Sequence, residues 1–112
     1  MRIQYNKLVR DRIPEIIREN HGSCETVSIE NNDEYISALF EKLVEEALEA
    51  LSARGDARHD AIVSELADVY EVLDAILVAL QIDPDMLRTQ QQEKRQNSGG
   101  FQERIFLLWS EN

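Results

Sequence analysis

Five acidic side chains on two segments are the residues of this chain best suited to chemistry. They are Glu45, Glu46 and Glu49 in LVEEALEAL, and Glu65 and Asp68 in SELADVYEVL. Each segment contains a pair of acids at i and i+3, and residues three apart on a helix are neighbours on its surface. If both segments are helical, each pair can therefore direct two carboxylates at one point.

The residues between the two segments predict that these pairs meet. Gly55-Asp56 is typical of a turn. If the two helices fold back there, a residue of the first helix lies opposite a residue of the second helix when the mean of their two numbers is 57. Glu46 is then level with Asp68. In the same way, Glu49 is level with Glu65. Carboxylates this close repel one another unless a cation lies among them, and oxygen ligands favour a hard divalent ion, Mg²⁺ or Mn²⁺.

The alternative is that the acids are an ordinary solvated helix face, as most such pairs are. The neighbouring residues argue against this, because on the second segment an apolar row at helical spacing is predicted to form the core: Ile62, Leu66, Val69, Leu73, Ile76 and Leu80. The adjoining row is small and apolar apart from its two acids: Ala61, Glu65, Asp68, Val72, Ala75 and Ala79. On the first segment the predicted core row is flanked by Glu46 and Glu49: Ile36, Leu39, Phe40, Leu43, Ala47 and Ala50. Burying unpaired carboxylates is costly, so this placement favours a cation site.

The composition limits the class of protein. A chain of 112 residues with 43% hydrophobic residues predicts one domain over 1–112. The net charge of −10 argues against a nucleic acid polymer as ligand, although a metal among the acids could bind a nucleotide. No apolar run approaches the ~20 residues of a membrane span. The start lacks the features of a secretory signal and Cys24 is the single cysteine, so we expect a cytoplasmic protein.

The pattern along the chain predicts an all-α bundle of about four helices. The expected helices cover roughly 11–20, 33–54, 57–81 and 84–97. Asn32 or Asp33 is expected to cap the second helix and Asp83 the fourth, where Pro84 follows. Two segments, 25–30 and 101–109, could form short strands that pair.

The third predicted helix has apolar residues on more than one side. Val63, Val72, Leu77 and Val78 lie off the main row, and a helix that is apolar over a wide arc is usually covered on several sides. We therefore expect oligomerisation to complete the bundle, as a homodimer or tetramer.

Basic residues gather near the two ends of the chain, outside the acidic segments. Lys7 and Arg10 lie in YNKLVRDR, and Lys94 and Arg95 lie in EKRQNSGGF. They either form ordinary surface ion pairs or contact the phosphates of a substrate, for which lysine and arginine are well suited.

With these residues laid out, the chain resembles the MazG-like all-α NTP pyrophosphatase superfamily. The family pattern EExxE, a spacer, then ExxD occurs here as Glu45-Glu46-Ala-Leu-Glu49, fifteen residues, then Glu65-Leu-Ala-Asp68. The flanks YNKLVRDRIPEII and KRQNSGGFQERIFL resemble a small single-domain branch described as house-cleaning or phosphoribosyl-ATP pyrophosphohydrolase-like. The resemblance extends over nearly the whole chain.

The resemblance implies a helical bundle completed by dimerisation, with Mg²⁺ held by Glu46, Glu49, Glu65 and Asp68. It also implies that Glu45 is an additional ligand or the base that orients water, so Glu45 and Glu46 are the predicted catalytic residues. The expected reaction is hydrolysis of a nucleoside triphosphate to a monophosphate and pyrophosphate. Two alternatives stay open: a phosphoribosyl-ATP pyrophosphohydrolase, and a non-catalytic helical module that binds a cation or a partner.

Overall fold

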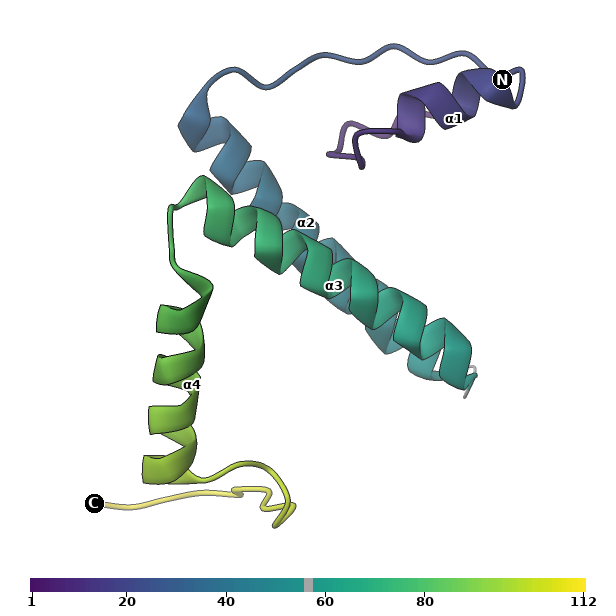
Figure 1. Ribbon diagram of the computed structural model, residues 1–112. Helices are drawn as coiled ribbons and strands as arrows, with labels where there is room; N and C mark the ends of the chain where they lie inside the picture. The colour runs from purple at the N-terminus through teal and green to yellow at the C-terminus, as the bar shows by residue number, and fades with distance from the viewer. Residues whose placement is uncertain (56–57) are drawn as a thin grey trace. The chain divides into compact units, whose positions relative to one another are not determined.

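The computed structural model describes residues 1–55 and 58–112, and the regular structure in this part of the chain is helical. The helices are α1 (Ile13–Glu19), α2 (Asn32–Gly55), α3 (His59–Ala79) and α4 (Pro84–Ser98) (Figure 1). The prediction of an all-α protein with about four helices is confirmed. The second half of the predicted Gly55-Asp56 turn and the predicted start of the third helix at Ala57 lie outside the described residues.

The two predicted strands are wrong. Neither 25–30 nor 101–109 is a strand, and no strand occurs anywhere in residues 1–55 or 58–112. Alternation and β-branched residues suit a pleated half-buried surface, but a strand also needs a partner for its backbone hydrogen bonds. These segments lie in different compact units, Met1–Leu80 and Gln81–Asn112. The single domain over 1–112 stays a prediction.

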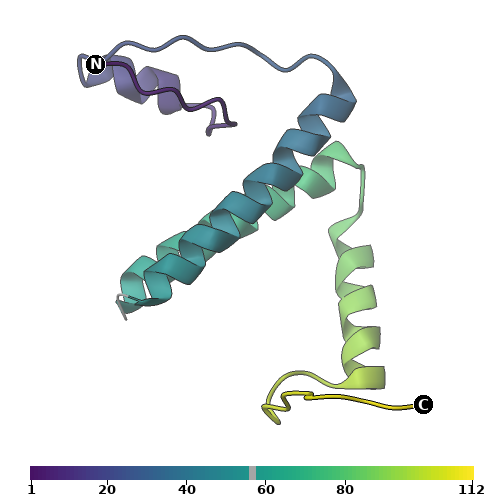
Figure 2. The same cartoon turned by 180° about the vertical axis from the view of Figure 1, so that it is seen from behind.

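The first unit is built around a hairpin of two long helices. In both views α2 and α3 lie side by side and run in opposite directions (Figures 1 and 2). The start of α2 is capped by Asn31, whose Oδ1 accepts a hydrogen bond from the backbone N–H of Glu34 at 2.9 Å. The predicted cap at Asn32 or Asp33 is therefore one or two residues too late, because only residue 31 is placed to reach the third N–H of the helix.

The hairpin core takes residues from two adjacent rows of α3. The buried cluster contains Leu39, Val72 and Ile76, with Ala75 and Ala79 packed against it. Ile76 belongs to the predicted core row, whereas Val72 and the two alanines belong to the row that carries the acids. The predicted core row is therefore confirmed at Ile76 but not at its exposed members, since Leu66 is 47% exposed and Leu80 is 41% exposed. Small side chains such as the two alanines let helices approach closely.

On α2 the predicted core row is confirmed at Leu39, which is 5% exposed, but not at Phe40, which is 46% exposed. Glu46, predicted at the edge of the core, is buried, whereas Glu49 is exposed. The hairpin therefore buries Glu46 and leaves large apolar side chains at its surface.

The second unit contains α4, which begins as predicted. The Asp83 side chain accepts a hydrogen bond from the backbone N–H of Asp85 at 2.9 Å, and a proline lies in the first turn. The helix ends at Gly99, whose φ of 85° is a conformation that favours glycine. No helix in the described ranges is both long enough and apolar enough to cross a membrane.

Candidate metal centre

The hairpin brings the five acids into two overlapping groups. Glu45, Glu46 and Glu49 form one group on α2, and Glu46 joins Glu65 and Asp68 of α3 in the other. Within each group, one carboxylate oxygen from every residue lies within 4.8 Å of the others. Glu46 belongs to both groups, and it is the residue through which the two helices share the site.

Two of these carboxylates have oxygens that are buried and unpaired. Glu46 is only 7% exposed, and neither its Oε2 nor the Oε2 of Glu65 accepts a hydrogen bond from any described residue. Buried polar atoms nearly always have a partner, and leaving one without a partner costs free energy. Carboxylate oxygens that converge in this way form a donor set that fits a hard divalent cation.

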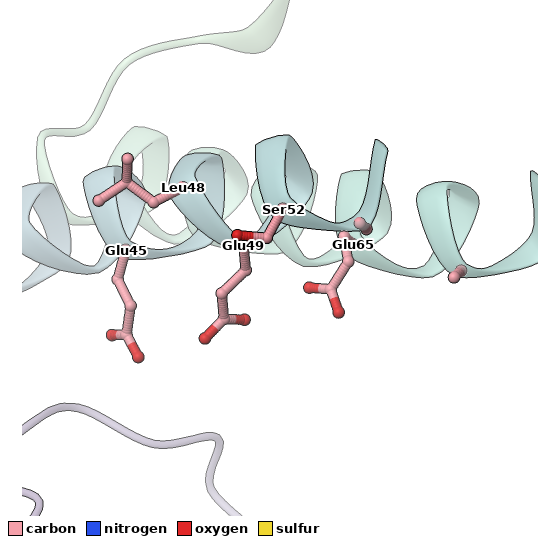
Figure 3. Close-up of a pocket in the computed structure, with 7 residues that line it drawn as sticks. Glu45, Leu48, Glu49, Ser52 and Glu65 are labelled. Carbon is pink, nitrogen blue, oxygen red and sulfur yellow. The ribbon is translucent and has the colours of Figure 1, made fainter. Parts of the chain in front are cut away.

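An open hollow adjoins the acids. It has a volume of about 520 Å³ and is lined by Glu45, Leu48, Glu49, Ser52, Ala53, Ala61 and Glu65. The carboxylates of Glu45, Glu49 and Glu65 extend from the same side of the hairpin (Figure 3). The small side chains beside them leave this side accessible to a ligand.

Lys42 is a member of this site that the sequence analysis did not single out. Its Nζ lies 3.1 Å from Glu45 Oε2 and 3.3 Å from Glu46 Oε1, and its side chain is 15% exposed. The spacing in the sequence could have identified Lys42, because it precedes Glu45 by three residues and Glu46 by four and therefore shares their helix face. Lys42 pairs with Oε1 of Glu46, and Oε2 of the same carboxylate is the oxygen without a partner among the described residues.

Two basic residues of the N-terminal segment also reach the acids. Lys7 Nζ lies 2.8 Å from Glu45 Oε1, and Arg10 Nη2 lies 2.7 Å from Asp68 Oδ1. The hydrogen bond from Lys7 lowers the pKa of Glu45, and the same contact raises the pKa of Lys7. Burial has the opposite effect on Glu46 and raises the pKa of that carboxyl group.

The other two predicted phosphate contacts lie in the second unit. Lys94 and Arg95 belong to the last turns of α4, and Arg95 lines a hollow of about 140 Å³ with Arg88, Gln91 and Gln92. Their role toward phosphate stays a prediction.

Comparison with known proteins identifies no relative of this chain. No protein-family model matches the chain, and no curated protein or solved structure is significantly similar to it. Membership of the MazG-like superfamily accordingly stays a prediction from the motifs.

Proposed function

We propose that this protein is a Mg²⁺-dependent nucleoside triphosphate pyrophosphohydrolase of the MazG-like type that its motifs resemble. The observation that carries the proposal is that Glu46, Glu65 and Asp68 bring carboxylate oxygens together across the hairpin, and that Glu46 and Glu65 each have a buried oxygen with no partner among the described residues. Helix surfaces commonly carry acids, but buried carboxylate oxygens that lack a hydrogen-bond partner are uncommon.

The residues that would hold the ion are Glu46, Glu49, Glu65 and Asp68. Mn²⁺ has similar ligand preferences and would serve as a substitute. When bound, the ion supplies charge neutralisation at the phosphates and lowers the pKa of a coordinated water.

The chain's own catalytic residues are proposed to be Glu45 and Glu46. Glu46 acts through its buried oxygen, which fixes the ligand set between the helices. Glu45 would orient the attacking water and accept its proton. Both Glu45 oxygens are paired with lysines, and the hydrogen bond from Lys7 lowers its pKa. One of these contacts must therefore open before Glu45 can take up a proton.

A nucleotide fits the remaining features of the site. The hollow of about 520 Å³ falls in the range of small-molecule sites, and the net charge of −10 disfavours longer nucleic acids. Lys7 and Arg10 are close enough to the acids to contact phosphates bound there, and Lys94 and Arg95 are further candidates. Disposal of noncanonical nucleotides in the cytoplasm is the role we propose.

A substrate panel tests the function. Canonical and modified NTPs and dNTPs, together with phosphoribosyl-ATP, are incubated with the protein and Mg²⁺ or with EDTA, and monophosphate and pyrophosphate are measured. We expect Mg²⁺-dependent release of pyrophosphate from one or more triphosphates. Preference for phosphoribosyl-ATP would identify the protein as a phosphoribosyl-ATP pyrophosphohydrolase instead. Mn²⁺ binding with no turnover of any compound would instead indicate a non-catalytic cation-binding module.

A further inference from the structure

Four residues of the N-terminal segment connect the two helices that carry the acids. In the strap, defined as residues 7–10, Lys7 pairs with Glu45 of α2 and Arg10 pairs with Asp68 of α3. Between them, Leu8 packs against the buried cluster of the hairpin. The strap therefore joins the two acid-bearing helices at Glu45 and Asp68 and is anchored to the hairpin by an apolar contact.

The cations of the strap occupy carboxylates that the proposed function requires. Asp68 is a proposed ligand of the ion, and Glu45 is the proposed base. An arginine or lysine paired with a carboxylate competes with any other cation for the same oxygens. Each contact in the strap is consequently an obstacle either to ion binding or to catalysis.

The strap is also the part of this charge network that is easiest to displace. The side chains of Lys7 and Arg10 are 37% and 56% exposed, and ion pairs of exposed groups are weak. Lys42, in contrast, belongs to α2 itself and is only 15% exposed. A divalent ion would thus replace the strap before it replaces Lys42.

We propose that the strap is a latch that pairs with Asp68 and Glu45 in the ion-free protein and is displaced by the divalent ion; this rests on the proposed metal centre. An ion on Asp68 would leave Arg10 without its partner. If the strap then moves away as a unit, Lys7 also leaves Glu45, whose Oε1 becomes free to accept a proton from water. Leu8 keeps the released cations near the site, where they can contact the phosphates of the arriving nucleotide.

Ion binding without nucleotide tests the latch. Mn²⁺ is titrated into the full chain and its free fraction is followed by electron paramagnetic resonance, for wild type, Arg10→Met and Arg12→Met. Arg12 is the matched control, since it carries the same charge in the same segment but pairs with Glu15 instead. We expect Arg10→Met to bind Mn²⁺ about three- to tenfold more tightly than wild type, as loss of a competing ion pair implies, and Arg12→Met to bind like wild type.

The outcomes separate the latch from the metal centre. Equal or weaker Mn²⁺ binding by Arg10→Met overturns the latch while leaving the metal centre in place, whereas the absence of Mn²⁺ binding in every variant overturns both.

Discussion

Glu45 and Glu46 are adjacent in the chain, yet the hairpin gives their carboxyl groups opposite environments. The Lys7 hydrogen bond lowers the pKa of Glu45, whereas burial raises the pKa of Glu46. The ionised form is thus favoured at Glu45 by folding and disfavoured at Glu46. A bound cation would stabilise the ionised form that burial disfavours at Glu46.

This contrast predicts opposite effects of two neighbouring substitutions on the ion-free protein. At pH 7 with EDTA, Glu45→Gln should lower the free energy of unfolding, because it removes a favourable charge. Glu46→Gln should raise it, because it removes a buried charge that burial opposes. Thermal unfolding of both variants measures the effects.

The pH dependence of that experiment follows from the signs of the shifts. The stabilisation from Glu45 is present above its unfolded pKa of about 4.3 and is lost as the pH falls through the lowered folded value. The penalty at Glu46 is fully present above its raised folded pKa, decreases as the pH falls below that value, and is gone below the unfolded pKa. The two variants should therefore converge toward wild type in acid. If both substitutions changed the free energy of unfolding in the same direction at pH 7, the opposite environments inferred for the Glu45 and Glu46 carboxyl groups would be contradicted.

Two conservative substitutions test the proposed ligands. Glu49→Gln and Asp68→Asn should each abolish Mg²⁺-dependent turnover, because each replaces an anionic oxygen donor with a neutral amide. The helical circular dichroism should persist, and the ion-free fold can gain stability through relief of repulsion. Turnover like that of wild type in both variants would exclude these residues as ligands.

The basic residues proposed to contact phosphate are tested by kinetics at saturating Mg²⁺. Arg10→Ala or Lys94→Ala should lower kcat/KM for a triphosphate by about an order of magnitude or more, as expected for loss of a charge-assisted contact. Stability should change little, since Arg10 is an exposed partner in its ion pair. An unchanged kcat/KM in both variants would assign these residues to ordinary surface ion pairing.

At the scale of elements, the sequence predicted the helices well because their apolar residues recur at helical spacing. It predicted the inward face of α3 only in part. Ile76, in the row led by Ile62, is buried as predicted, but Val72 in the adjacent row led by Ala61 is buried as well, and Leu66 and Leu80 are exposed. How much of each row meets α2 depends on how closely the two helices approach, and small residues such as Ala75 and Ala79 allow the closer contact. Lys42 was missed for a similar reason: a lysine usually indicates a solvated position.

The start of α2 offers a test of element boundaries. Asn31→Ala should destabilise the protein by about 1 kcal/mol, because the Glu34 N–H loses the acceptor seen at 2.9 Å. Asn32→Ala is the matched control and should have a much smaller effect, since residue 32 lies inside the helix. Chemical denaturation measures the free energy of unfolding of both variants. A larger loss of stability in Asn32→Ala than in Asn31→Ala would show that residue 32 is the N-cap.

At the scale of the whole molecule, the buried apolar set is small for a chain of 112 residues. Among the described residues, the buried hydrophobic side chains are Leu39, Val72, Ile76 and Leu77. Large apolar side chains remain exposed in each unit, including Val78 at 79% and Trp109 at 71%. Exposed apolar surface of this kind marks an interaction site. Sequence periodicity indicated the surplus of apolar residues, but a single chain does not show what covers them.

We propose that other copies of the chain cover this surface, so that the protein is at least a homodimer. Sedimentation at micromolar concentration should then show a dimer or tetramer and no folded monomer. Val78→Lys should weaken association, because it places a charge within the apolar surface of α3, whereas Asp74→Lys, on the same helix at a polar exposed position, should leave association intact. Loss of helical circular dichroism together with dissociation in Val78→Lys would show that folding and assembly are coupled. A wild-type monomer that is folded and stable as the sole species would refute self-association and leave the exposed valines and leucines of α2 and α3 without a partner.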